Sequence, residues 1–256
     1  MKKFIITIFC FSALIKAHEK LALVNNTDPN YIITPHLTIQ KAGVTDAKHF
    51  VTLASDHQVS RYMFCSEASE DDIKKIADSW FKTKIVAPLV FLMPSKWTFH
   101  RWMIRKTDAE KPANEHEVIG SLSIMNLDDK NILELLRKYD PEHYKNYPNL
   151  GLCLKPSEWG KGYARESLYA LLSKLFVANE FKQLKGLALC INKDHERCIN
   201  CVMKKNEGNA RKPFVYHGEV YLPNGFTKVV PKPCTVKCFT VNREDFLQFS
   251  GIRNNN

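Results

Sequence analysis

What this chain of 256 residues lacks excludes several classes of protein. It has no internal repeat, which excludes a solenoid or a propeller. Lysine and arginine outnumber aspartate and glutamate by 37 to 27, yet they form no basic block of the kind that binds nucleic acid. A composition of 45% hydrophobic and 25% charged residues is that of a globular protein. The net charge of +10 favours an acidic partner, such as a nucleotide-like cofactor.

Long apolar runs are scarce too. One from Phe4 to Ile15 is shorter than a secure membrane span and follows two lysines. With Ala17 at the small-residue position, residues 1–17 match a signal peptide. An uncleaved hydrophobic anchor or an overextended start would give the same pattern, so all three interpretations stay open.

The sequence after residue 17 predicts a single domain. Residues 18–35 are polar, contain two prolines and are typical of a linker. We expect the domain to span residues 36–249 and a short tail to occupy residues 250–256. Periodicity predicts strands at 36–40, 98–106, 117–127, 150–154, 184–191, 214–221 and 235–241, and helices beginning near 46, 69, 131, 163 and 194.

The most informative stretch covers residues 153–166. A Pro-Ser pair ends a short apolar strand, and leucines recur at helical spacing from about Tyr163 onward. Gly160 and Gly162 therefore fall where a strand ends and a helix begins. The first amides of a helix have no backbone partner, and glycines let several of them converge on a phosphate. Lys161 and Arg165 are expected to add positive charge there.

A Gly-rich turn alone also fits a tight loop before a surface helix, but the residues themselves carry a resemblance. The run from Trp159 to Ala164 (WGKGYA), followed by Glu166 and an apolar helix, resembles the acetyl-CoA pyrophosphate loop of GNAT N-acetyltransferases. The RimJ/RimL-like branch, which acetylates ribosomal-protein N-termini, is the most similar. In the family pattern, Gln or Arg is followed after two residues by Gly, and then after one residue by Gly or Ala. Trp159, Gly162 and Ala164 occupy these positions, with Trp in place of Gln or Arg.

The resemblance implies a fold and a set of cofactor contacts. The fold is α/β, a single GNAT-type domain with a mixed, mostly antiparallel central sheet of six or seven strands flanked by helices. The strand before the loop is expected to splay from its neighbour, so that the pantetheine arm of acetyl-CoA pairs with its backbone. The expected cofactor-binding residues are Leu152, Cys153, Leu154, Trp159, Gly160, Lys161, Gly162, Tyr163, Ala164 and Asn192.

The catalytic groups follow less directly. The family places a Ser or Tyr near the thioester sulfur, but no Tyr lies between Asn192 and Asn209. His195 or Cys198 is therefore the expected proton donor to the leaving thiolate. The oxyanion is expected to bind a strand amide near Leu154. For the base, the acidic cluster at residues 115–117 is one option, and a solvated charge cluster is the other.

Two further segments have alternative interpretations. The connection at residues 131–149 is longer than the one usual in the family. We expect this segment either to cover the substrate side or only to pack against the domain. Tyr62, Phe64 and Trp80 either line the acceptor cleft or belong to the core. Eight cysteines permit a zinc site or disulfides, but buried free thiols are the simpler interpretation, and we predict no metal.

The sequence thus predicts an acetyl-CoA-dependent N-acetyltransferase acting on a primary amine, either a protein N-terminus or a small amine such as a polyamine. The alternatives are an exported GNAT-like domain that has lost catalysis, and an extracellular binding module stabilised by disulfides or zinc. No direct nucleic-acid binding is expected. The leader indicates export, whereas acetyl-CoA is a cytosolic metabolite, so the two signals point to different compartments.

Overall fold

The computed structural model describes residues 30–64, 68–82, 100–112, 115–127, 129–144, 147–177, 184–203, 213–225 and 232–250. The expected leader, most of the expected linker and the tail after Ser250 lie outside these ranges. Within them, no helix combines the length and the apolar character that crossing a membrane requires.

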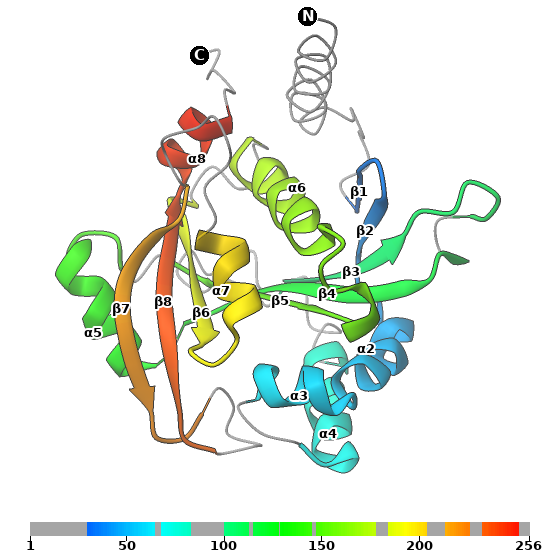
Figure 1. Ribbon diagram of the computed structural model, residues 1–256, viewed down its shortest axis with the longest axis horizontal. Coiled ribbons are helices and arrows are strands. Elements are labelled where there is room, and N and C mark those ends of the chain that lie inside the picture. Colours follow the sequence, from blue (N-terminus) through cyan, green and yellow to red (C-terminus); the bar gives the residue numbers. More distant parts are fainter. Residues whose placement is uncertain are drawn as a thin grey trace, which may run out of the picture.

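One twisted sheet of eight strands forms the centre of the molecule (Figure 1). Its order is β1-β2-β3-β4-β5-β6-β8-β7, and only β5 and β6 are parallel neighbours. The strands are β1 (Tyr31–Ile33), β2 (Leu37–Lys41), β3 (His100–Lys106), β4 (Val118–Met125), β5 (Asn149–Leu154), β6 (Gly186–Asn192), β7 (Val215–Leu222) and β8 (Cys234–Asn242). The predicted α/β class and mixed, mostly antiparallel sheet are confirmed.

The strand count is higher than predicted because of β1. The amide of Thr34 donates to the carbonyl oxygen of Leu37 at 2.8 Å, and the amide of Leu37 donates to the Thr34 hydroxyl at 3.0 Å. This turn reverses the chain, so that β1 pairs antiparallel with β2. β1 lies within residues 18–35, where the sequence predicts a linker.

The helices are α2 (Ala47–Ala54), α3 (His57–Met63), α4 (Glu70–Lys82), α5 (Lys130–Tyr139), α6 (Tyr163–Val177), α7 (Glu196–Met203) and α8 (Arg243–Ser250). α3 was not predicted. The carboxylate of Asp56 starts it by accepting from the amides of Gln58 and Val59, at 2.8 and 3.3 Å. The predicted start near residue 69 is confirmed, because the Ser69 hydroxyl accepts from the Asp72 amide at 3.1 Å.

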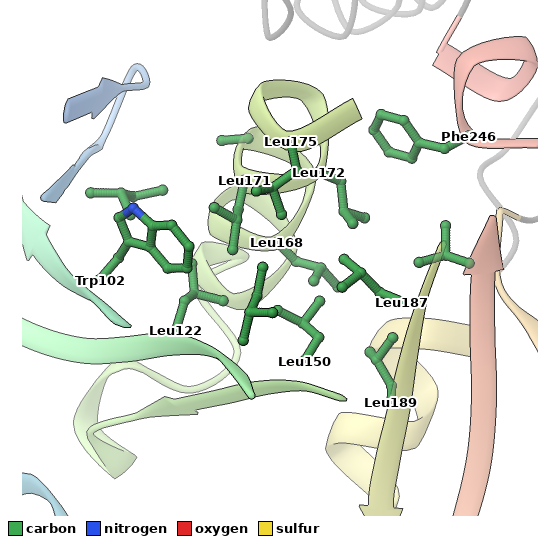
Figure 2. Packing of buried hydrophobic residues seen from close by; sticks show 14 of the residues in the cluster. Trp102, Leu122, Leu150, Leu168, Leu171, Leu172, Leu175, Leu187, Leu189 and Phe246 are labelled. Carbon is green, nitrogen blue, oxygen red and sulfur yellow. The ribbon is translucent and has the colours of Figure 1, made fainter. Parts of the chain in front are cut away.

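α6 is held firmly against the sheet. Leu168, Leu171, Leu172, Leu175 and Phe176 are at most 2% exposed. Figure 2 shows the leucines of α6 pointing toward the strands, where they share one core with Trp102, Leu122, Leu150, Leu187 and Leu189. Burial of each such side chain is worth about 1.5–3 kcal/mol. The position of the first turn of α6 relative to β5 is therefore fixed by the core.

β5 and β6 diverge. They pair at a single position, Asn149 with Ala188. Beyond it, Figure 1 shows the two strands separating toward their carboxyl ends, Leu154 and Asn192. The predicted splay is confirmed. The gap opens at the carboxyl ends of parallel neighbours, which is the usual place for ligands in α/β sheets.

α5, in the longer connection after β4, lies away from this gap. It packs beside β7 at the edge of the sheet (Figure 1). Ile132 and Leu136 are 2% exposed and share a small core with Val220 and Cys238. Of the two interpretations of this segment, the structure favours packing, because the apolar face of α5 covers β7 and β8.

Candidate active site

The turn between β5 and α6 contains two glycines in the left-handed region. φ is +83° at Gly160 and +87° at Gly162, a conformation that costs other residues free energy. A Cβ added at either position would meet no atom within 4 Å, so the space in front of the turn is open. The sequence prediction of a glycine turn leading into a helix at Tyr163 is confirmed.

The turn presents a run of backbone donors. Arg165 and Glu166 are the first amides that bond back to the turn, both to the carbonyl oxygen of Gly162, at 3.1 and 3.0 Å. Among the residues that the structure describes, none accepts from the five amides of residues 160–164. Five adjacent N–H groups at the positive end of a 15-residue helix are suited to bind a phosphate.

The charges near the turn differ from the prediction. The Lys161 ammonium lies 3.1 Å from both carboxylate oxygens of the buried Glu158. The Arg165 guanidinium turns to the ring of Tyr169, 5.6 Å from its centroid, so it points along the helix and not into the turn. Arg197, which the sequence analysis missed, lies 5.9 Å from the Trp159 ring centroid. It comes from α7, and no local pattern links it to the turn.

Glu166 has a positioning role. Its carboxylate accepts from the Thr34 hydroxyl and, at 3.0 Å, from the His36 amide. The His36 ring nitrogen Nδ1 also lies 3.0 Å from it. Glu166, two residues after the WGKGYA run, therefore links the first turn of α6 to the turn between β1 and β2.

The gap between β5 and β6 also offers backbone donors. The amide of Lys155 donates to Ile119 on β4 at 2.8 Å. Because N–H groups alternate sides along a strand, the amides of Leu152 and Leu154 face away from β4, toward the gap. Cys153 lies between them and pairs with Ser121 on β4. The backbone of residues 152–154 thus borders the gap, and its contact with acetyl-CoA stays a prediction.

Three aromatic rings meet at the open end of this gap. The indole Nε1 of Trp159 donates to the Leu154 carbonyl oxygen at 2.9 Å, which fixes the ring at the end of β5. His195, after β6, lies 5.7 Å from Trp159 between ring centroids. Tyr62 of α3 stacks on His195, with centroids 4.0 Å apart and planes 16° apart. Tyr62 was only one of several possible cleft residues in the sequence.

His195 is neutral in the fold. Burial, reinforced by the charge of Arg197, lowers the pKa of His195 to about 4. A neutral imidazole is a poor proton donor, so this environment disfavours the acid role predicted for His195. The ring instead serves as the middle of the aromatic group.

This lowered pKa predicts a pH dependence of stability. Unfolded His titrates near pH 6.5, so the unfolded chain gains a proton first and stability falls as the pH drops toward the folded pKa of about 4. His195→Phe keeps a ring but cannot be protonated. We expect its melting temperature to fall less between about pH 7.5 and about pH 5 than that of the wild type. His57→Phe, at an exposed position, should keep the wild-type response; equal responses of all three proteins would contradict the assignment.

Cys198 and Asn192 are both engaged locally. Cys198 packs against the main core, and burial raises the pKa of its thiol to about 12. This packing disfavours its predicted acid role. The Asn192 side-chain oxygen accepts from the Asp194 amide at 3.0 Å. Asn192 is 8% exposed, at the end of β6, where its predicted cofactor contact would occur.

The face of the sheet opposite α6 carries buried polar side chains. The Cys153 thiol lies 3.2 Å from the Ser121 hydroxyl. Burial raises the pKa of this thiol, and it outweighs the hydrogen bond with Ser121 and the charge of Arg101, which both lower the pKa. The Arg101 guanidinium, 4.2 Å from the Phe50 centroid, places a cation under α2 and α4. Burial lowers the pKa of Arg101 to about 9, so it stays charged at neutral pH.

The acidic cluster considered for the base lies elsewhere. Residues 115–117 line a cavity of about 410 Å³ together with His49, Arg105 and Lys155. His116 is buried, and its Nε2 lies 2.8 Å from the carbonyl oxygen of Asp108. Glu117 pairs with Lys155 at 2.7 Å. These contacts fit a structural cluster, and no base is assigned to it.

The cysteines give little support to a metal site. Cys153, Cys190, Cys198, Cys201 and Cys238 are free, and Cys234 is disulfide-bonded. No group of three or more His, Cys, Asp or Glu side chains suited to a metal ion occurs in the part of the chain that the structure describes.

Comparisons with known proteins agree with this geometry. Residues 36–206 match the family model described as an acetyltransferase (GNAT) domain. No curated protein matches the chain. A GNAT-family acetyltransferase from Bacillus anthracis is 14% identical, with a TM-score of 0.51, over 84% of this chain and 99% of that one.

Two other solved structures differ in their acceptors. A spermidine N-acetyltransferase from Vibrio cholerae, in complex with CoA and spermine, is 14% identical, with a TM-score of 0.52 over 82% of this chain and 98% of that one. A ribosomal-protein-S5-alanine acetyltransferase from Vibrio fischeri is 12% identical, with a TM-score of 0.55, over 84% of this chain and 98% of that one. At these identities the likeness establishes the fold and not the acceptor.

Proposed function

Because the chain belongs to the GNAT acetyltransferase family, whose members use acetyl-CoA, we propose that it transfers an acetyl group from acetyl-CoA to a protein N-terminal amine. The observation that carries this proposal is the run of five amides at residues 160–164, which have no acceptor within the described ranges and lie next to the gap between β5 and β6.

The residues present fit acetyl-CoA. The amides of residues 160–164 would hold its pyrophosphate, and the open space before Gly160 and Gly162 leaves room for it. The gap-facing amide of Leu152 would pair with the pantetheine arm. When bound, acetyl-CoA supplies an activated acetyl group. The Leu154 amide is suited to stabilise the negative charge that develops on the acetyl oxygen during attack by the amine.

The choice of acceptor follows from the resemblance of the loop to the RimJ/RimL-like branch, and the ribosomal-protein-S5-alanine acetyltransferase among the solved structures supports it. A polyamine is the second candidate, supported by the spermidine acetyltransferase neighbour.

A direct assay tests this proposal. The full chain is incubated with acetyl-CoA and either N-terminally free peptides, the same peptides with blocked N-termini, or spermidine. Acetylated products are measured by mass spectrometry, because the free cysteines of the protein would interfere with a thiol reagent. We expect acetylation of the free peptides only. Acetylated spermidine alone would move the acceptor to a polyamine, and CoA binding without any transfer would indicate an inactive domain.

A further inference from the structure

We propose that Cys190 and Cys238 form a disulfide that joins β6 to β8 when the chain is exposed to a disulfide oxidant. The two residues are direct partners in the antiparallel pairing of these strands, which lie side by side in Figure 1. Partners of this kind project from the same face of a sheet, because side chains alternate in step along both strands. Both thiols are free in the structure, which therefore shows the open, reduced pair.

The register of the strands places the two residues at a suitable separation. The Lys193 amide donates to the Thr235 carbonyl oxygen at 3.0 Å, so Lys193 and Thr235 are a hydrogen-bonded pair. Hydrogen-bonded and non-hydrogen-bonded pairs alternate along an antiparallel ladder. Cys190 and Cys238 are three steps away in the same register, which makes them a non-hydrogen-bonded pair. The Cα atoms of such a pair are about 4.5 Å apart, within the range of about 4.4–6.8 Å that disulfides span.

The two thiols also contact each other in the reduced state. Both belong to the small core between α5 and the sheet, whereas Leu189 and Ile191 face the core under α6. A hydrogen bond with the Cys238 thiol, together with burial, raises the pKa of Cys190 well above its ordinary value. Thiols that stay protonated at neutral pH react slowly. We therefore expect closure to require a disulfide oxidant and to be slow in the folded chain.

Of the two thiols, Cys190 is the one that an oxidant reaches first. Cys238 is 1% exposed, whereas Cys190 is only partly buried. Cys234 lies four residues before Cys238, in the same small core, and is already disulfide-bonded. The strand that carries Cys238 is therefore compatible with a cross-linked sulfur beside α5.

The other free cysteines of the described chain are less suitable. Cys198 and Cys201 lie one turn apart on α7, where Cβ atoms are about 5–6 Å apart. A disulfide requires a Cβ separation of about 3.5–4.5 Å. Cys153 is paired with a serine on β4. Among these five thiols, only Cys190 and Cys238 face each other across a pair of strands.

The oxidation is balanced by the disulfide oxidant. The sulfur of Cys190 forms a bond to one sulfur of the oxidant, and the bond between the two oxidant sulfurs breaks. The departing sulfur takes the electron pair and the proton of Cys190. The sulfur of Cys238 then attacks that of Cys190, and the second half of the oxidant leaves as a thiol with the proton of Cys238. Two protein thiols are oxidised, and one oxidant disulfide is reduced to two thiols.

The closed pair would join the ends of a segment of about 50 residues that contains α7 and β7. A cross-link of this kind restricts the unfolded chain, so its main effect is on stability. Disulfides persist in oxidising compartments, whereas thiols stay reduced in the cytosol. We therefore expect the pair to stabilise the domain in an oxidising compartment and to remain as two free thiols in a reducing one.

Mass spectrometry tests the linkage. The full chain is reduced, oxidised glutathione is added either to the folded chain or during its refolding from urea, the remaining thiols are alkylated, and the digest is analysed without reduction. We expect a peptide that joins Cys190 to Cys238 and is absent from Cys190→Ala. Cys201→Ala is the matched control, since it also removes a partly buried thiol but should keep the joined peptide. Alkylation of both thiols in both treatments, or a glutathione adduct on Cys190 without the joined peptide, would overturn the assignment.

The melting temperature gives a second readout. We expect oxidation to raise it more in Cys201→Ala than in Cys190→Ala, by about 5 °C or more. The comparison removes the contribution of the Cys234 disulfide, because both variants retain that cysteine. Equal rises in the two variants would contradict the stabilising role of the pair. The proposed acetyl transfer is unaffected by either result, because neither measurement depends on acetyl-CoA.

Discussion

Replacing Gly162 with glutamate is expected to weaken acetyl-CoA binding more than 100-fold. The new side chain has room, because no atom lies within 4 Å of its Cβ position. Its carboxylate would project into the open space before the free amides of residues 160–164. There it would repel the pyrophosphate and compete for the same N–H groups. Loss of two or more charge-assisted hydrogen bonds, each worth about 1.5–3 kcal/mol, accounts for the size of the effect.

Gly162→Ala is the matched control. It carries the same backbone strain at φ +87°, which costs about 1–3 kcal/mol of stability, but it adds no charge. Calorimetric titration of the two variants with acetyl-CoA, each first shown to be folded by circular dichroism, separates the two causes. We expect Gly162→Ala to bind within about tenfold of the wild type. Equal affinity of Gly162→Glu and the wild type would contradict the assignment of the turn.

Replacing Asp46 with alanine is expected to lower the free energy of unfolding by about 3–5 kcal/mol. Its carboxylate lies 2.7 Å from the Arg105 guanidinium, and both side chains are less than 10% exposed. Arg105 also donates to the carbonyl oxygen of His116 at 3.0 Å. Removing Asp46 takes away the carboxylate that lies against this buried cation and the acceptor of the Gly43 amide.

Urea denaturation measures this change. Glu70→Ala is the matched control, since Glu70 pairs with Lys74 at 2.8 Å on the exposed surface of α4. An exposed pair of this kind is worth about 0–1 kcal/mol. If Asp46→Ala lowers the free energy of unfolding no more than Glu70→Ala does, the Asp46–Arg105 pair behaves as a solvated pair, which would contradict this prediction.

Much of the fold was predictable because its signals are local. The helix that begins at Tyr163 follows two glycines and a proline, and these residues constrain the chain without any distant contact. The strand pattern from residue 36 to 241 was predictable for the same reason, since each strand alternates or is briefly apolar. The family resemblance of the WGKGYA run supplied the splay between β5 and β6, which no periodicity encodes.

What was missed depends on distant partners. β1 is a strand only because β2 lies beside it, and three residues give no periodic signal. The stack of Tyr62 on His195 joins positions 133 apart in the sequence. The direction of Arg165, toward Tyr169 and away from the turn, is a rotamer choice made by packing. Sequence reasoning therefore located the turn and the gap, but not the side chains that surround them.

Hydrogen–deuterium exchange of the full chain, with and without acetyl-CoA, tests the central claim most directly. The amides of residues 160–164 have no acceptor among the residues that the structure describes, so they should exchange fast in the free form. We expect acetyl-CoA to slow exchange in the segment 155–166 and at residues 152–154, and to leave α5 and β7 unchanged. Binding without protection of residues 160–164, or no binding at all, would contradict the assignment of this turn as the acetyl-CoA site.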